Sequence, residues 1–377
     1  MKRLLLIILL SLTALPALCC TTAIVSAGAS KSGRPMLWKQ RDGAVNTCLA
    51  YVSGGKYGYT GLFLTEDTGH KKAYAGINEA GFGIINNLSY NVRPDSVKTD
   101  PQNGVFMALV LASCATLEDF EAMLAAKRKP WNLSANFGVV DAGGGAAYFE
   151  VSDDTVVRYD VPEGGFLYRT NYSLSGDSER LAGRTRFVNI EHLMQRHAPR
   201  KFDPEFFFAC SRDFVNVNLG GDLLRSRRSG YIYDADFIPR ASTSSAIVIE
   251  GVLPGERADS GLMWCAIGYP PCSYAVPVWV AAGDRIPVMM TGEAPANLLA
   301  ESLRSSLRTL SWDKHYLEVK PLRRTIELVK RFERDEFRAG RKLDKVFRER
   351  GLDAAALEQY NKGADARFEL FKSQFDL

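Results

Sequence analysis

Short apolar runs, each bounded by Gly, Asn or Asp, fill most of the first half of the chain after its N-terminal segment. The runs are rich in β-branched and aromatic residues, which is typical of β-strands. The predicted strands span residues 21–26, 47–52, 73–77, 82–88, 135–140 and 146–151. Three more are predicted at residues 244–252, 261–267 and 275–281.

Helical patterns interrupt these strands. Thr116, with Asp119 three residues later, predicts a capped helix that runs to residue 126. Residues 181–196 have apolar positions at helical spacing, and Asp203-Pro204 is typical of a helix start. Residues 295–377 are predicted to be mainly helical, with an apolar stripe formed by Ile326, Val329, Phe332 and Phe337.

Blocks of strands separated by pairs of helices predict an α+β fold with largely antiparallel sheets. The elements do not alternate regularly enough for a doubly wound parallel sheet. No linker stands out, so residues 20–377 are predicted to form one domain, with residues 295–377 as its helical C-terminal extension.

The N-terminus has the layout of a secretory signal peptide. A basic start, Met1-Lys2-Arg3, precedes an apolar run at residues 4–15, which is shorter than the ~20 residues that a membrane-spanning helix needs. Ala17 and Cys19 are small residues at the −3 and −1 positions of a cut before Cys20. We therefore expect removal of residues 1–19 and export to the periplasm or the extracellular space, with no membrane span.

The composition bears on which classes of partner and cofactor the protein is expected to bind. The formal net charge of +4, from 47 basic and 43 acidic residues, gives no sign of a nucleic-acid partner. The seven cysteines include no CxxC pair and fit no zinc pattern, so no metal or cofactor is predicted. Export permits a Cys265–Cys272 disulfide, but free cysteines buried as small hydrophobes are the expected state.

A cysteine left as residue one has its own chemistry. A free N-terminal amine has a pKa of about 7.7 to 8, so it can accept a proton near neutral pH. Cys20 would then carry both a nucleophile and a base. Two alternatives stay open, namely an incidental residue at a processing site and a lipidated cysteine. The second is disfavoured because no Gly, Ala or Ser directly precedes Cys20.

Further motifs follow in order along the chain. Cys20-Thr21 is followed by Asp42, then by Gly76-Ile77-Asn78-Glu79-Ala80-Gly81, and then by Thr170-Asn171. This ordered set, across residues 20–268, resembles the group of N-terminal-nucleophile (Ntn) enzymes that contains choloylglycine hydrolase, penicillin V acylase, acid ceramidase and isopenicillin-N acyltransferase. The resemblance implies a four-layer αββα sandwich of antiparallel sheets.

The resemblance also implies roles for single residues. Cys20 would be the nucleophile, Asp42 would orient its amine, and Asn171 would donate a hydrogen bond to the oxyanion. Asn87, or its neighbour Asn86, matches a second oxyanion or substrate contact. A surface salt bridge is the alternative for Asp42, and a turn at a strand end is the alternative for Asn171.

The match departs from the group at two positions. Lys39 stands where several relatives have an arginine, and a lysine lacks the planar fork of a guanidinium. Many relatives have a site arginine after the Thr-Asn pair. Arg186 is the first candidate for it and Arg180 the second, while an arginine on a helix surface is the alternative.

Other enzyme classes fit less well. A papain-like protease needs a suitably placed histidine, and the chain offers only His70, His192, His197 and His315. A zinc hydrolase lacks its histidine pair. The sequence therefore predicts an exported amidohydrolase that acts on a small-molecule linear amide. An acyltransferase and an inactive binding protein of the same fold are the alternatives, and a homo-oligomer is compatible with the sequence.

Overall fold

The computed structural model describes residues 20–375, apart from residues 44, 95, 98, 227–229, 234, 236 and 309–315. The predicted signal peptide, residues 1–19, and the histidine at position 315 lie outside the described residues. Within the described part of the chain, no helix combines the length and the apolar character that crossing a membrane requires.

Cys20 directly precedes an interior strand of a six-stranded antiparallel sheet. The strand order is β10 (Phe166–Arg169), β1 (Thr21–Val25), β2 (Met36–Asp42), β14 (Thr243–Glu250), β15 (Leu262–Ile267) and β16 (Val276–Trp279). β1 is therefore held on both sides, with Thr22 opposite Arg169 on one neighbour and opposite Lys39 on the other.

A second, seven-stranded antiparallel sheet follows the chain order from edge to edge. Its strands are β3 (Thr47–Val52), β4 (Tyr59–Leu64), β5 (Ala75–Asn78), β6 (Gly83–Leu88), β7 (Ala135–Val140), β8 (Ala146–Val151) and β9 (Val156–Asp160). The two sheets pack face to face, and the side chains between them form the core. Ile24 and Leu37 of the first sheet and Ile85 of the second belong to it, and all three are fully buried.

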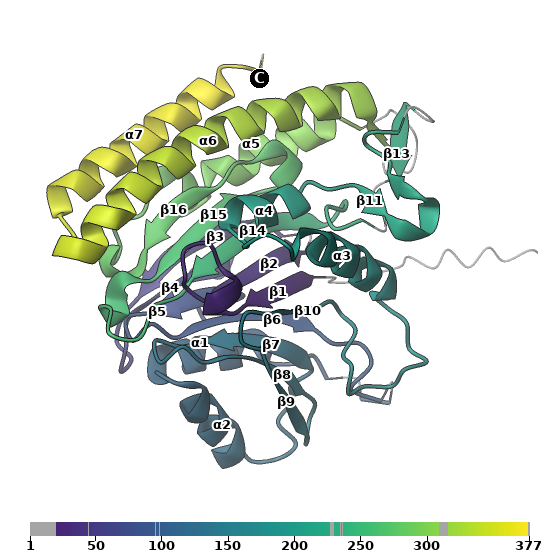
Figure 1. Ribbon diagram of the computed structural model, residues 1–377, viewed down its shortest axis with the longest axis vertical. Helices are drawn as coiled ribbons and strands as arrows, with labels where there is room; N and C mark the ends of the chain where they lie inside the picture. The colour runs from purple at the N-terminus through teal and green to yellow at the C-terminus, as the bar shows by residue number, and fades with distance from the viewer. Residues whose placement is uncertain are drawn as a thin grey trace, which may run out of the picture.

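Helices cover the outer face of each sheet (Figure 1). α1 (Asn103–Ser113) and α2 (Leu117–Ala126) lie on the seven-stranded sheet. The other side carries α3 (Arg184–His197), α4 (Pro204–Cys210), α5 (Pro295–Ser306), α6 (Val319–Arg350) and α7 (Ala354–Lys372). Short pairs complete the fold, β11 (Val215–Asn216) with β12 (Gly221–Asp222) and β13 (Tyr231–Tyr233) with β17 (Tyr316–Glu318). The predicted αββα architecture is confirmed.

Local sequence signals explain several element boundaries. The Thr116 hydroxyl accepts the Asp119 N–H at 3.1 Å, and the Asp119 carboxylate accepts the Thr116 N–H at 3.2 Å, which closes the predicted capping box of α2. Asp203 caps α4 by accepting the Phe206 N–H at 2.9 Å, with Pro204 in the first turn. α3 begins three residues later than predicted, at Arg184, directly after Gly183 with φ +87°.

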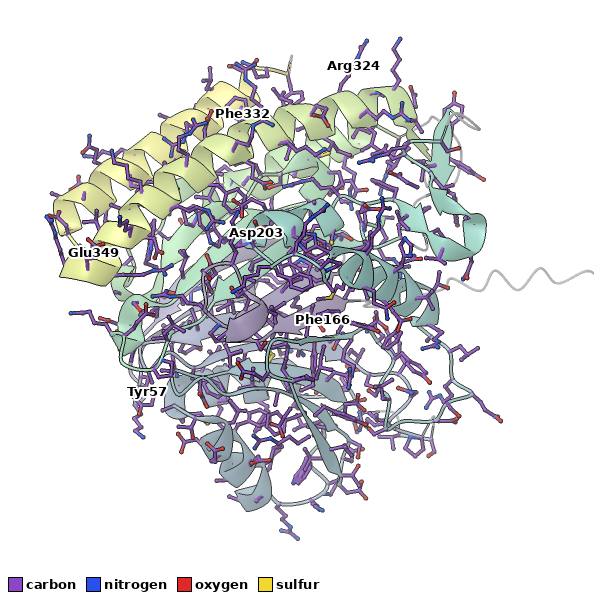
Figure 2. The ribbon with its side chains drawn as sticks, viewed as in Figure 1. Tyr57, Phe166, Asp203, Arg324, Phe332 and Glu349 are labelled. Carbon is purple, nitrogen blue, oxygen red and sulfur yellow. The ribbon has the colours of Figure 1, made fainter. Side chains whose placement is uncertain are left out.

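The C-terminal helices close the six-stranded sheet from outside. Val329, Phe332 and Phe337 of the predicted stripe are buried, whereas Arg324 and Glu349 lie on the outer side of α6 (Figure 2). A buried ion pair fixes α6. Arg212, just after α4, donates to Glu333 at 2.6 and 2.8 Å, and Glu333 also accepts the Ala275 N–H at 2.9 Å.

Glu333→Ala is expected to lower the free energy of unfolding by ~3–5 kcal/mol, because it leaves the Arg212 cation buried without its carboxylate. Urea unfolding monitored by circular dichroism measures the change. The control is Glu327→Ala, also on α6, whose exposed pair with Lys330 is expected to contribute less than ~1 kcal/mol. Equal effects of the two substitutions would contradict this account of how α6 is anchored.

Candidate active site

Cys20 lies in the space between the two sheets. Its side chain is 7% exposed and lines a cavity of about 370 Å³. Along β1, Thr22 faces the seven-stranded sheet, where its hydroxyl accepts a hydrogen bond from the Tyr148 hydroxyl at 2.8 Å, and Thr21 faces α3. Side chains alternate along a strand, so Cys20 is on the same side as Thr22. The thiol therefore faces the seven-stranded sheet and this cavity, and not α3.

Arg186 connects the Cys20 backbone to Asn171. One guanidinium nitrogen donates to the Cys20 carbonyl oxygen at 2.7 Å and to the Thr21 hydroxyl at 3.0 Å. The other donates to the Asn171 side-chain oxygen at 2.8 Å, which directs the Asn171 nitrogen the other way, to the Leu88 carbonyl at 2.6 Å. The planar fork of the arginine thus holds the nucleophile candidate and the oxyanion candidate in one arrangement.

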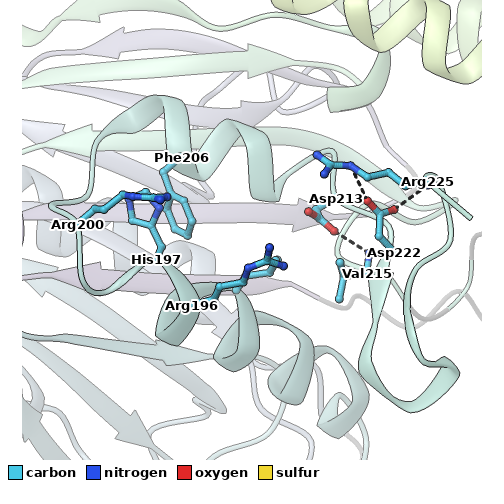
Figure 3. Close-up of a pocket in the computed structure, with 9 residues that line it drawn as sticks. Arg196, His197, Arg200, Phe206, Asp213, Val215, Asp222 and Arg225 are labelled. Carbon is cyan, nitrogen blue, oxygen red and sulfur yellow. Dashed lines mark hydrogen bonds and ion pairs between the residues drawn. The ribbon is translucent and has the colours of Figure 1, made fainter.

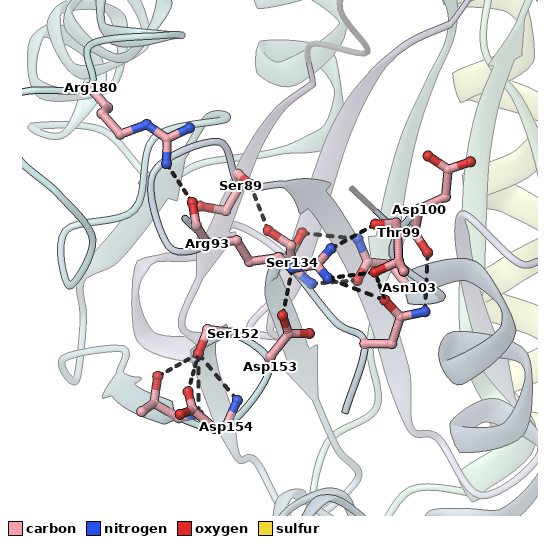
Figure 4. A network of polar contacts seen from close by, with 12 residues as sticks. Ser89, Arg93, Thr99, Asp100, Asn103, Ser134, Ser152, Asp153, Asp154 and Arg180 are labelled. Atoms are coloured by element: carbon pink, nitrogen blue, oxygen red, sulfur yellow. Dashed lines mark hydrogen bonds and ion pairs between the residues drawn. The ribbon is translucent and has the colours of Figure 1, made fainter. Parts of the chain in front are cut away.

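The second candidate, Arg180, lies elsewhere. It donates to the backbone carbonyl of Arg93, whose own side chain contacts Asp153 and Thr99 (Figure 4). Nearby, Asn103 and Ser134 exchange two hydrogen bonds at 3.0 Å, which anchor the start of α1. Of the two arginines that the sequence offered, Arg186 is the one that contacts Cys20.

Asp42 is a buried carboxylate at the end of β2. Its Oδ1 accepts a hydrogen bond from the Thr243 hydroxyl at 2.6 Å, whereas its Oδ2 has no hydrogen-bond partner in the part of the chain that the structure describes. Burial raises the pKa of Asp42 to about 6, although the positive charges of Arg240 and Arg186 oppose the rise. The salt bridge at the surface that the sequence left open does not form, since Asp42 is 1% exposed.

Lys39 is a buried cation without a carboxylate partner among the described residues. Its Nζ donates to the Tyr74 carbonyl and to the Asn86 side-chain oxygen, both at 2.7 Å. Burial lowers the pKa of Lys39 to about 8, while negative charge on Cys20 would raise it. Lys39 therefore holds Asn86 in place, and its positive charge would attract a Cys20 thiolate.

Asn86 and Asn87 point in opposite directions along β6. Asn86 is bound by Lys39 and lines the cavity. Gly83 lies against Leu37 of the six-stranded sheet, so Asn87, four positions on, faces that sheet as well. Asn87 is fully buried, and no described residue forms a hydrogen bond with its side-chain oxygen or nitrogen.

Other residues of the motifs support the site without lining it. Asn78 accepts the backbone N–H groups of Ala80 and Phe82 at 3.0 Å, and Gly81 has φ +78°, so this motif forms the tight turn between β5 and β6. The polar residues 243–245 begin β14. There Thr243 holds Asp42, and Ser244 accepts a hydrogen bond from Arg41.

Arg41 and Tyr74 are among the cavity residues that sequence reasoning missed. Arg41 could have been found, because it is two positions after Lys39 on the same strand and next to Asp42. Tyr74 comes from the segment before β5, and it reaches the cavity through the packing of two sheets that no local pattern records.

A larger hollow of about 530 Å³ lies beside α3 and does not contain these residues (Figure 3). Arg196, His197 and Arg200 line one side of it, while Asp213 and the Asp222–Arg225 ion pair line the other. No cysteine lines this hollow among the described residues. The cavity beside Cys20 is therefore the better candidate for covalent chemistry.

No protein-family model matches the chain, and no curated protein matches its sequence. Three similar solved structures are an N-acylethanolamine-hydrolyzing acid amidase ortholog from Caenorhabditis elegans, a penicillin V acylase from Agrobacterium tumefaciens and a conjugated bile acid hydrolase from Clostridium perfringens. Their TM-scores are 0.42, 0.40 and 0.41, and their identities 14%, 16% and 12%. They cover 61%, 69% and 69% of this chain and 92%, 86% and 92% of their own.

All three belong to the Ntn group whose motifs the sequence resembles. At such low identities the likeness concerns the fold, and with TM-scores below 0.5 it places no side chain of this chain. The description of the site rests on the contacts of its own residues.

In protein that keeps its N-terminal segment, Asp42→Asn is expected to remove part of the pH dependence of the free energy of unfolding. The pKa of Asp42 is raised to about 6, so between about pH 4 and 6 the folded chain retains a proton that the unfolded chain has lost. The wild-type free energy of unfolding should then fall as pH rises through this window, by up to ~3 kcal/mol from this group.

Urea unfolding at several pH values from 4 to 7 measures this slope. The control is Asp259→Asn, which changes a carboxylate held in an ion pair near the surface and should leave the slope unchanged. A wild-type slope that persists in Asp42→Asn would contradict the assigned pKa shift.

Proposed function

We propose that this protein is an exported amidohydrolase that cleaves a linear amide C–N bond through an acyl-cysteine intermediate at Cys20. Removal of residues 1–19 would free the amine that the reaction needs. The observation that carries the proposal is the convergence of Cys20, Asp42 and the Arg186–Asn171 pair around one buried site. The names of the similar solved structures, all of them amidases, acylases or hydrolases, agree with it.

The first half-reaction uses Cys20 as both nucleophile and base. The neutral amine takes the thiol proton, and the sulfur attacks the carbonyl carbon of the amide. The ammonium that results returns its proton to the departing amine, which leaves an acyl thioester. Asp42 fits the role of orienting group, because its Oδ2 is a buried acceptor with no other partner and a carboxylate there stabilises the ammonium.

The oxyanion of the tetrahedral intermediate needs hydrogen-bond donors. Asn171 is the first candidate, and Arg186 fixes the orientation of its amide. Asn87 is a second, since its side-chain nitrogen is buried without a partner on the face of β6 that looks toward the six-stranded sheet. Asn86 is the weaker choice, because alternation along β6 directs its side chain away from the face that looks toward the six-stranded sheet.

The second half-reaction resolves the thioester. Water, activated by the same amine, attacks the acyl carbon and releases the acid and the free thiol. An exported enzyme works in bulk water without an obvious acyl-CoA supply, which favours hydrolysis over acyl transfer. No group of three or more potential metal ligands gathers among the described residues, and the proposed steps use only side chains and the amine.

Cys20→Ala should abolish turnover across a panel of bile-salt, penicillin, N-acyl amino acid, ceramide and short peptide amides. Asn171→Ala should lower kcat by ~100- to 1000-fold with a smaller change in KM, which is the usual effect of removing an oxyanion donor. Asn218→Ala is the matched control. Asn218 is exposed in the turn after β11, so its substitution should leave kcat and KM unchanged. Activity that survives Cys20→Ala would move the nucleophile elsewhere, and transfer to an added amine without hydrolysis would favour the acyltransferase.

A further inference from the structure

Arg41 is a buried arginine that forms no ion pair within the described residues. Its side chain lies in the cavity beside Cys20, and the residue is 3% exposed. Its contacts are neutral, namely a hydrogen bond to the Ser244 hydroxyl and the face of the Tyr74 ring, with the guanidinium carbon 4.6 Å from the ring centre. No carboxylate of the described chain thus forms an ion pair with Arg41, although its charge also acts on Asp42.

Other buried arginines of the protein are treated differently. Each of three contacts a glutamate at 2.6 Å: Arg34 with Glu256, Arg169 with Glu150, and Arg212 with Glu333. Arg186 has no carboxylate either, but its guanidinium is engaged by the Cys20 carbonyl, Thr21 and Asn171. Arg41 therefore stands out as a cation directed at a cavity.

A buried charge without a counter-charge is costly, and an arginine cannot escape that cost by losing its proton. An anion that enters the cavity would form charge-assisted hydrogen bonds with Arg41. These would offset part of the free energy that the arginine loses on leaving water. Lys39 and Lys72 line the same cavity and add positive charge. The acidic residues there are Asp42, which the proposed function assigns to the amine of Cys20, and Asp100, which is exposed at the rim.

The cavity also has an apolar part, to which the end of β6, the segment before α1 and the first turn of α1 contribute. Leu88, Pro101 and Val105 line it, whereas Lys39 and Arg41 come from β2. An apolar acyl chain fits the first group of residues. The cations of β2 are then left for the other half of the amide, the amine that departs.

We propose that Arg41 determines specificity by binding a carboxylate on the amine half of the substrate, so that the enzyme prefers N-acyl amino acids to neutral N-acyl amines. The assignment of Arg41 to the amine half of the substrate, and not to the acyl half, rests on the proposed function. The carboxylate site itself depends only on Arg41 and the cavity.

Gly43 provides an independent way to disturb Arg41. A Cβ at this position would come within 2.6 to 2.8 Å of the guanidinium, closer than non-bonded atoms approach. The backbone of Gly43 is not in the left-handed region, so alanine is tolerated there and the arginine has to shift instead. Gly43→Ala therefore moves the positive charge without removing it.

The test compares an N-acylglycine with the N-acylethanolamine of the same acyl chain. The two differ in a carboxylate against a hydroxyl, and kcat and KM are measured separately for each. The mature wild type should prefer the acylglycine by at least ~10-fold in kcat/KM. Arg41→Gln should reduce that preference by roughly 10- to 100-fold, mainly through KM for the acylglycine, while the ethanolamide changes little.

Two further variants distinguish the loss of the carboxylate site from a loss of folding. Gly43→Ala should raise KM for the acylglycine more than for the ethanolamide, and Arg41→Lys should keep part of the preference. The control is Arg158→Gln, which removes an arginine from an ion-paired cluster on β9, away from the cavity, and should alter neither substrate. No preference in the wild type, or equal losses on both substrates in Arg41→Gln and Gly43→Ala, overturns the inference.

A binding measurement separates this inference from the proposed function. Calorimetry with Cys20→Ala protein gives Kd for both ligands without turnover, and Arg41→Gln in that background should weaken only the acylglycine. Selective binding without wild-type hydrolysis would refute the proposed reaction and keep the Arg41 site. Hydrolysis with equal binding of the two ligands would refute the Arg41 site and keep the reaction.

Discussion

The Arg186 guanidinium makes the contact on which the site depends. It reaches from α3 to the carbonyl oxygen of Cys20 at 2.7 Å and to the side-chain oxygen of Asn171 at 2.8 Å. An arginine can bind acceptors in two fixed directions at once, which the single ammonium of a lysine cannot do in the same way. The start of β1 and the end of β10 are therefore held in register by one side chain of the covering helix. Because Asn171 is oriented through its oxygen, its nitrogen faces the side of the seven-stranded sheet.

Unpaired charge is concentrated at this site. Elsewhere the protein neutralises buried cations with carboxylates, as in Arg169–Glu150 and Arg212–Glu333. At the end of β2, by contrast, Lys39 and Asp42 are buried with only neutral hydrogen-bond partners among the described residues. Burial lowers the pKa of the lysine to about 8 and raises that of the aspartate to about 6. Groups that titrate near neutrality are the ones that can exchange protons in catalysis.

Much of this arrangement could be predicted from the sequence. The strands at residues 47–52, 135–140 and 146–151 and the caps at Thr116 and Asp203 were predicted with the bounds that the structure has, because local patterns determine them. α1 was missed because residues 103–113 are apolar on nearly every side and show no stripe. β4 and the exposed edge strand β9 were also missed, since Gly61 interrupts the first and charged residues alternate in the second.

The residues of the site were also only partly predictable, because some of them depend on contacts between distant segments. Cys20, Lys39, Asp42, Asn171 and Arg186 were chosen from motifs, and the structure brings them together. The choice between Asn86 and Asn87 depended on which face of β6 looks toward the six-stranded sheet, and Tyr74 enters through contacts between distant segments. These are properties of how the sheets pack, which local patterns do not record.

The most direct test of the account is the mass of the N-terminal peptide of the exported protein. If Cys20 is to supply both thiol and amine, the mature chain must begin at an unmodified Cys20. The account predicts that mass, and it also predicts a thioester adduct on the same peptide when turnover of an amide substrate is quenched in acid. Retention of residue 19 or a lipid on the cysteine would contradict it, because either would leave the thiol without the free amine beside it.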